Sequence, residues 1–313
     1  MNISIQLLQE NELATADHIF RLAFGTFNGL PKPTDFAGDC DYIRHRWKTN
    51  PQAAFSAEVD GKLIGSNLVT KWGSFASFGP LSVHPDFWNQ GIAQRLIKPA
   101  ISCFEQWNTQ LAGIHTFAQS PKHHGLYQKF GFRLRFLTTI LGKSVEQAAP
   151  LPENSRYSQM SETEQIESLK ASIQLADSIY PGLDLSQQIQ TVNSQNLGDT
   201  VFLWDDSGLV GFAVCHIGAG TEAGSNNCFV KFGTVRLGNN AEKRFDCLLD
   251  LCESLTLAEG MLRLVAGVNT SRESAYLQML SRGFRSQIIG VAMHRPNEPG
   301  YNRTDVFAVE DWR

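Results

Sequence analysis

The spacing of apolar residues in the first half of the chain predicts alternating helices and strands. Apolar and polar residues alternate at 3–8, as in a half-buried strand, and they recur at helical spacing at 11–25, at 39–48 and from residue 92 onward. Asp60-Gly61 is a hairpin signal between two strands, and Gly79-Pro80 is expected to interrupt a third, because proline cannot donate to a sheet. The remaining elements of this half are strands at 53–59, 62–72, 74–83, 112–118 and 132–141 and a helix at 122–130.

The second half repeats this order in a weaker form, which suggests an internal duplication. Gly283-Phe284-Arg285 repeats Gly131-Phe132-Arg133 at an offset of 152 residues. Because 313 residues exceed the usual size of one domain, we expect two domains. The predicted division is a first domain at 1–146, a linker at 147–156 and a second domain at 157–313. Strands are expected at 200–204, 209–217, 229–237 and 262–268, and helices at 245–255 and 271–282.

Composition and charge narrow the class of protein. Hydrophobic residues make up 42% of the chain, enough for two ordinary cores, and the net charge is −4 without any run of Lys or Arg. We therefore expect no nucleic acid and no membrane as partners, and no apolar run approaches the roughly 18 residues that span a bilayer. Six cysteines without Cys-x-x-Cys spacing, and a start without a signal-peptide pattern, favour a reduced, cytoplasmic protein with no metal ligands.

The segment from Val83 to Leu96 predicts a strand, a tight turn and the start of a helix. The first N–H groups of a helix have no intrahelical partner, and the helix dipole adds partial positive charge, so a phosphate can bind there without Lys or Arg. Gly91 has no side chain to keep a ligand from the backbone, and Asn89 readily adopts a left-handed turn. The segment therefore predicts an anion site.

Together with a later segment, Leu126-Tyr127-Gln128-Lys129-Phe130-Gly131-Phe132, this loop resembles the two signatures of the GNAT superfamily of acetyl-CoA-dependent N-acyltransferases. Gly91 and Ala93 match the small positions of that family's pyrophosphate loop, Arg/Gln-x-x-Gly-x-Gly/Ala. Trp88 stands where the family usually has Arg or Gln, and Asn89 replaces a common Gly. The resemblance covers 1–142 by motif and 157–292 by pattern. It implies an α/β (α+β) fold of two GNAT-like domains, each a mixed, mostly antiparallel sheet flanked by helices.

The resemblance also implies a cofactor, acetyl-CoA (coenzyme A), and a set of residues that bind it. The backbone N–H groups around Leu81 to Val83 would donate to the developing oxyanion. The second copy passes from Val235 to Ala241 in six positions where the first takes ten from Val83 to Ala93, so one cofactor site is expected. The implied cofactor-binding residues are Leu81, Ser82, Val83, Trp88, Asn89, Gln90, Gly91, Ile92, Ala93 and Ser120.

Two residues are candidates for the chemistry. By the resemblance, Tyr127 faces the cofactor sulfur, where a phenol of pKa about 10 can protonate a thiolate of pKa about 8.5. The alternative is a half-buried aromatic residue whose hydroxyl binds a backbone carbonyl. His115, in the middle of a strand, is the candidate base, with a structural histidine as the favoured alternative. In the second copy Met279 replaces the tyrosine and cannot donate a proton.

These observations predict direct transfer of an acetyl group from acetyl-CoA to a primary amine in a ternary complex. The acceptor would be a small-molecule or peptide amine. An alternative is a binding or regulatory module that senses acyl-CoA without turnover, since Trp88 departs from the motif and the base is not identified. Aminoacyl transfer from a charged tRNA fits poorly with the negative net charge. The acceptor and the oligomeric state, monomer or homodimer, stay open.

Overall fold

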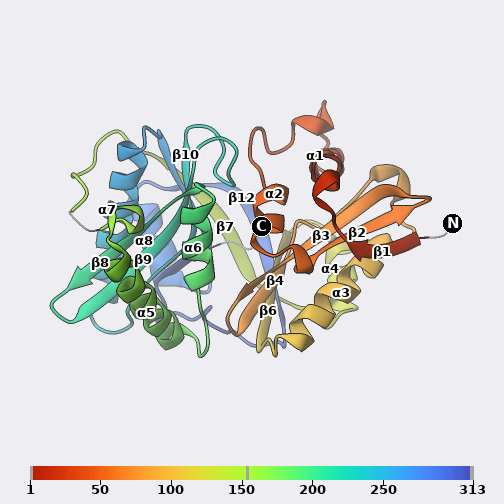
Figure 1. Cartoon of the computed structure of the whole chain (residues 1–313). Coiled ribbons are helices and arrows are strands. Elements are labelled where there is room, and N and C mark those ends of the chain that lie inside the picture. Colours follow the sequence, from red (N-terminus) through yellow and green to blue (C-terminus); the bar gives the residue numbers. More distant parts are fainter. Residues whose placement is uncertain (1–2, 153–154, 311–313) are drawn as a thin grey trace.

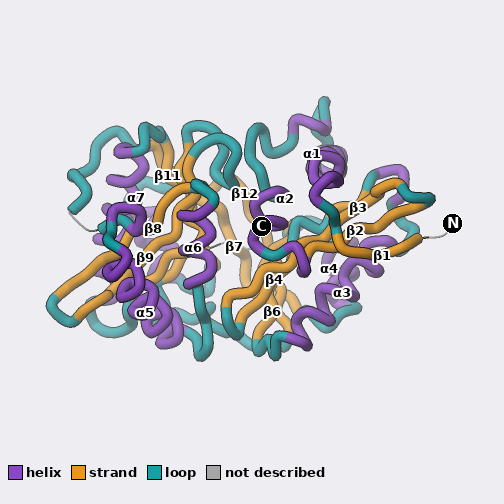
Figure 2. The backbone as a smooth tube through the Cα atoms, in the orientation of Figure 1, coloured by secondary structure: helices purple, strands orange, loops and turns teal. Residues whose placement is uncertain are grey.

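The computed structural model of the chain describes residues 3–152 and 155–310, so positions 153–154 of the predicted linker lie outside the described residues. A single mixed sheet of 13 strands runs through the molecule, and helices cover its faces (Figures 1 and 2). Most neighbouring strands are antiparallel; β4 with β6 and β10 with β11 are the parallel pairs between described strands. The predicted α/β class is confirmed.

The first half follows the predicted order closely. Its strand order in the sheet is β1-β2-β3-β4-β6, with β5 paired to β3. The expected interruption at Gly79-Pro80 is confirmed, because one strand ends at Phe78 and the next begins at Ser82. The elements are β1 (Ile3–Leu7), α1 (Leu13–Phe27), α2 (Ile43–Thr49), β2 (Ala54–Val59), β3 (Lys62–Trp72), β4 (Phe75–Phe78), β5 (Ser82–Val83), α3 (Ile92–Gln106), β6 (Leu111–Phe117), α4 (Pro121–Gln128) and β7 (Arg133–Ser144).

The described elements of the second half repeat the order of the first half from α1 to β7, without a counterpart of β5, and add a strand at the end. Two of its helices, α5 and α6, were not predicted from the sequence. In α5 the core-facing side includes Ser168 and Ser172 while Ile166 is exposed, so the apolar periodicity is weak. The elements are α5 (Glu162–Ile179), α6 (Ser186–Ser194), β8 (Gly198–Asp205), β9 (Gly208–Ile217), β10 (Asn227–Val235), α7 (Ala241–Ala258), β11 (Arg263–Asn269), α8 (Glu273–Ser281), β12 (Arg285–Arg295) and β13 (Ala308–Glu310).

The two halves exchange their closing strands. Strand β12 of the second half lies between β6 and β7, with Ala292 opposite His115, and β7 of the first half pairs with β11 (Figure 1). Alternation along a strand indicates which face is buried but not which strand is its neighbour, so this exchange has no signature in the sequence. The predicted division at 146 and 157 stays a prediction about the chain, and both halves contribute to one sheet.

Apolar packing continues across the junction between the halves. Trp72 of β3 contacts Phe232 of β10, with ring centroids 5.6 Å apart, and Phe75 of β4 contacts Tyr301, at 5.9 Å. All four side chains are buried in the same core cluster. Within the described ranges of the chain, no helix combines the length and apolar character needed to cross a membrane.

Candidate active site

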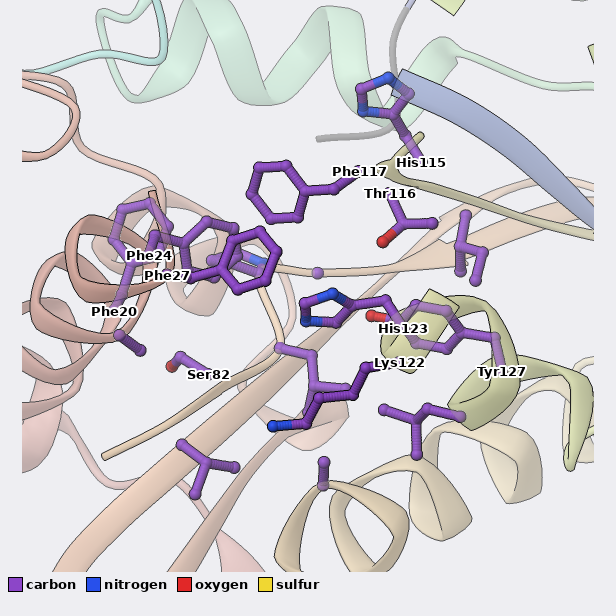
Figure 3. A pocket seen from close by; sticks show the side chains of 18 of the residues that line it. Phe20, Phe24, Phe27, Ser82, His115, Thr116, Phe117, Lys122, His123 and Tyr127 are labelled. Atoms are coloured by element: carbon purple, nitrogen blue, oxygen red, sulfur yellow. The ribbon is translucent and has the colours of Figure 1, made fainter. Parts of the chain in front are cut away.

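A cavity of about 920 Å³ lies where β4 and β6 diverge (Figure 3). These strands pair only from Phe75 to Ser77, opposite Leu111 to Gly113, after which β6 continues to Phe117 paired with β12 but no longer with β4. Helix α1 forms one wall, α4 another, and the loop before α3 closes one end. The cavity therefore receives residues from elements far apart in the sequence, including Gly290 on the exchanged strand β12.

Eight of the ten predicted cofactor residues line this cavity. Strand β5 is one edge of it. The backbone N–H of His84 donates to the carbonyl oxygen of Ile64 in β3 at 2.8 Å. Because successive N–H groups of a strand point in opposite directions, the amide of the preceding residue, Val83, points away from β3 and toward the cavity. The eight are Leu81, Ser82, Val83, Trp88, Asn89, Gly91, Ile92 and Ala93.

The loop before α3 has the backbone conformation expected of an anion site. Asn89 and Gly91 both adopt left-handed conformations, with φ of 64° and 77°. A Cβ atom added at Gly91 would meet no protein atom within 4 Å, because this position opens on the cavity. Helix α3 begins at the next residue, so its first N–H groups are available to a bound anion. The residues present fit a diphosphate at this end.

Trp88 closes the loop and brings a cation to it. Its indole Nε1 donates to the carbonyl oxygen of Val83 at 2.7 Å, which ties the loop to β5. The Lys122 ammonium of α4 lies 5.2 Å from the centre of the Trp88 ring and lines the cavity. The loop therefore gains from α4 a positive charge that its own sequence lacks. Lys122 was not predicted from the sequence, since nothing in its spacing relates it to Trp88.

Two predicted cofactor residues, Gln90 and Ser120, are not among the described residues of the cavity wall. The Gln90 side chain donates to the backbone oxygen of Asp86 at 3.4 Å. Ser120 caps α4, and its hydroxyl lies 2.6 Å from Nδ1 of His123, which does line the cavity. Ser120 thus orients a cavity residue. Burial lowers the pKa of His123 to about 4, so this imidazole is neutral near pH 7.

Tyr127 lies on the cavity wall and is 8% exposed. Its hydroxyl is hydrogen bonded to the side chain of Thr116, and its ring packs on Phe78 with centroids 5.9 Å apart. Burial raises the pKa of Tyr127 to about 12, so the phenol keeps its proton throughout the neutral range. The structure thus places a protonated hydroxyl group at the cavity.

His115 lies on the other face of β6 from Tyr127. It is the neighbour of Thr116, so the two side chains leave the strand in opposite directions, as Figure 3 shows. Its imidazole lies over Gly290 of β12, where an added Cβ atom would come within 2.1 Å of Nε2. The absence of a side chain at Gly290 therefore makes room for His115. The sequence could not indicate this, because it requires the strand exchange.

A buried charged cluster lies next to the cavity. Within the described part of the chain, His45, His216 and Glu222 form one group whose ligand atoms lie within 4.8 Å of one another. The Glu222 carboxylate already accepts from Arg46 at 2.7 Å and from Lys231 at 2.6 Å, so a metal ion would face two positive charges. Arg46 also donates to the carbonyl oxygen of Gly79 at 2.8 Å. We interpret the cluster as an ion-pair network that fixes the end of β4.

Comparison with known proteins identifies the same family. The sequence model described as the acetyltransferase (GNAT) family matches residues 18–132, which include the loop before α3 and Tyr127. No curated protein sequence matches the chain.

Solved structures resemble nearly the whole chain at low identity. A GCN5-related N-acetyltransferase from Sphaerobacter thermophilus is 15% identical, with 93% of this chain and 95% of that chain covered and a TM-score of 0.60. A Pyrococcus horikoshii protein, described provisionally as an acetyltransferase, is 9% identical, with 99% of this chain and 95% of that chain covered and a TM-score of 0.67. At these identities the likeness shows a shared fold that extends over both halves. Residues 18–132 therefore match a GNAT acetyltransferase domain, and the fold that the chain shares with these structures extends over both halves.

Proposed function

We propose that the protein is an acetyl-CoA-dependent N-acetyltransferase that transfers the acetyl group directly to a primary amine in a ternary complex. One observation carries the proposal. A single cavity joins an anion site at α3 to the Tyr127 hydroxyl and, on the opposite face of β6, to the His115 imidazole. The family match at residues 18–132 supports acetyl transfer in general, and this arrangement supports the amine as acceptor.

The anion site and β5 would hold the cofactor. When bound, acetyl-CoA supplies an activated acetyl thioester. The first N–H groups of α3, with the Lys122 ammonium, would bind its diphosphate. The amide of Val83 would donate to the acetyl carbonyl oxygen, where negative charge develops during transfer.

The two side chains on opposite faces of β6 would move the protons. Tyr127 holds a proton on its hydroxyl and would give it to the leaving sulfur, because its raised pKa excludes the phenolate at neutral pH. His115 would accept a proton from the attacking amine, directly or through water. Because one cavity is lined by both side chains, amine and thioester can bind in it at the same time. This favours direct transfer.

Tyr127→Phe is the test. Release of free CoA should fall roughly 100-fold in kcat, because only the transition state uses the proton, while the Kd of acetyl-CoA stays within about twofold. Tyr276→Phe, a half-buried tyrosine on α8, is the matched control and should leave kcat unchanged. With the raised pKa of Tyr127, the parent enzyme should show no alkaline loss of kcat from the phenol below about pH 10.

Either of two results would contradict the proposal. The first is that the parent protein binds acetyl-CoA but releases no CoA with any amine, which would favour an acyl-CoA-binding module. The second is that Tyr127→Phe retains full kcat, which would leave the phenol without a role in proton transfer.

A further inference from the structure

Aromatic rings form one wall of the cavity, on the side of α1 (Figure 3). Phe20 and Phe24 of α1 lie 4.9 Å apart between centroids, Phe24 lies 5.8 Å from Phe117, and Phe27 lies 4.6 Å from Phe117. Phe36, from the segment after α1, completes the set at 5.4 Å from Phe24. We call these five residues the aromatic wall. Its surface suits a flat apolar group, whose binding is stabilised both by the burial of apolar surface and by contacts between rings.

The described wall of the cavity offers no carboxylate to a second ammonium group. Among residues 3–152 and 155–310, no aspartate or glutamate lines it, and its fully charged side chains are Lys122 and Lys129. A buried ammonium without a carboxylate costs several kcal/mol, and nearby lysines increase that cost. Each additional positive charge on an acceptor would therefore weaken its binding.

The mouth of the cavity is apolar as well. Ile288 and Ile289 of β12 line it and are 48% and 50% exposed. They extend the apolar surface from the aromatic wall to solvent. An acceptor longer than a single ring would therefore keep apolar contacts along its length, whereas the hydroxyl groups of a sugar would find no partners on this apolar surface.

We propose that the acceptor is a monoamine with an apolar, arylalkyl body, a refinement that rests on the proposed function. The amine would enter from the aromatic wall and reach His115, which shares the cavity. The same surroundings assist its deprotonation. An apolar cavity without carboxylates lowers the pKa of the bound ammonium, so a larger fraction is the neutral nucleophile.

The experiment compares amines of different charge and polarity with the full-length protein. We measure kcat/KM for CoA release with 2-phenylethylamine, hexylamine, putrescine and glucosamine. We expect kcat/KM for 2-phenylethylamine to exceed that for putrescine and for glucosamine by at least about tenfold, with hexylamine between. Only 2-phenylethylamine and hexylamine bury their whole body without unpaired polar groups.

Two pairs of variants place this selectivity on the cavity wall. Ala37 lines the cavity with φ of 64°, a conformation that Asp and Asn adopt more readily than Ala. Ala37→Asp should therefore fold and raise putrescine relative to 2-phenylethylamine by about tenfold, whereas Ala37→Asn, of equal size but neutral, should not. Phe24→Ala should raise KM for 2-phenylethylamine about tenfold, and Phe24→Leu by less. Phe136→Ala, which changes an exposed phenylalanine outside the aromatic wall, is the control.

The outcomes separate this inference from the function on which it rests. Equal or higher kcat/KM with putrescine or glucosamine would overturn the acceptor class and leave amine acetylation intact. The same shift for Ala37→Asp and Ala37→Asn would show that charge does not select the acceptor, and would also overturn it. No CoA release with any of the four amines, although acetyl-CoA binds, would refute amine acetylation, and the acceptor class with it.

Discussion

The same place in the two halves of the molecule is open in one and filled in the other. In the first half, β4 and β6 part after three paired residues, and the gap is the cavity. In the second half, β10 and β11 pair from Asn227 to Val230, and then the gap is occupied by β13, which pairs with Phe232 to Thr234 of β10. The fold repeats, but a strand from the end of the chain takes the place that a ligand could occupy.

The side chains around the two gaps differ as well: that of Tyr127 faces the cavity, and those at the corresponding places of the second half are buried in the core. Tyr127 presents a hydroxyl to the first gap, whereas Met279, at the corresponding position of α8, is fully buried in the core. At the start of α4 stands Ser120, and at the start of α8 stands Arg272, which forms a buried ion pair with Glu310 of β13 at 2.5 Å. A repeated backbone thus supports chemistry only where the gap stays open and the polar groups stay available.

Substitution of matched glycines should give the largest difference between the halves. Gly91 lies in the loop before α3, and Gly238 lies in the corresponding loop before α7. Both have positive φ, and a Cβ atom added at either would meet no protein atom within 4 Å. Gly91→Asp should weaken acetyl-CoA binding more than about 100-fold by filling the anion site with a negative charge. Gly238→Asp should leave it within about twofold. Isothermal titration calorimetry measures both, and should give one site per parent chain.

Equal losses from the two glycine variants, or two equivalent sites on the parent chain, would contradict the assignment of the cofactor to the first half alone.

The ion pair that holds β13 should matter for stability and not for the cofactor. Glu310→Gln leaves the fully buried Arg272 without its carboxylate, which should lower the free energy of unfolding by about 3 kcal/mol. The variant, where folded, should bind acetyl-CoA with an unchanged Kd. Urea denaturation and calorimetry check the two parts. A large loss of affinity without a loss of stability would show that the second gap acts on the first.

The cofactor end of the site could be predicted from the sequence because its residues are local. Asn89 adopts the left-handed conformation expected of it, and Gly79-Pro80 interrupts the strand as expected. These features depend on backbone preferences of single residues and on the start of a helix, which a short segment determines. Ser120 stays a predicted cofactor residue that is not among the described residues of the cavity wall, because capping α4 turns its hydroxyl toward His123.

The acceptor end could not be predicted, because it forms only in three dimensions. Phe20, Phe24 and Phe27 have the spacing of an ordinary core face of a helix, and nothing along the chain indicates that they border a cavity. Gly290 makes room for His115 only because β12 crosses into the first half. That crossing also means that cutting the chain at the predicted linker would remove β12 from between β6 and β7.

Lys122 should give the smallest of these effects and sharpen the account of the open half. Lys122→Met keeps much of the packing on Trp88 and removes the charge, so the Kd of acetyl-CoA should rise about fivefold, the size expected for one exposed contact to a phosphate. Lys71→Met is the matched control, because Lys71 lies in the same way over Trp107, at 5.7 Å, and is not one of the described residues of the cavity wall.

The charge of the ligand decides whether Lys122 acts on the diphosphate. S-acetylpantetheine carries the thioester without any phosphate, so Lys122→Met should leave its kcat/KM unchanged while that of acetyl-CoA falls. Raising the salt concentration should shrink the difference between the parent and Lys122→Met for acetyl-CoA, since screening weakens an exposed charge contact. An equal loss for both thioesters would place Lys122 in the packing of the loop instead, with the backbone of α3 as the main anion site.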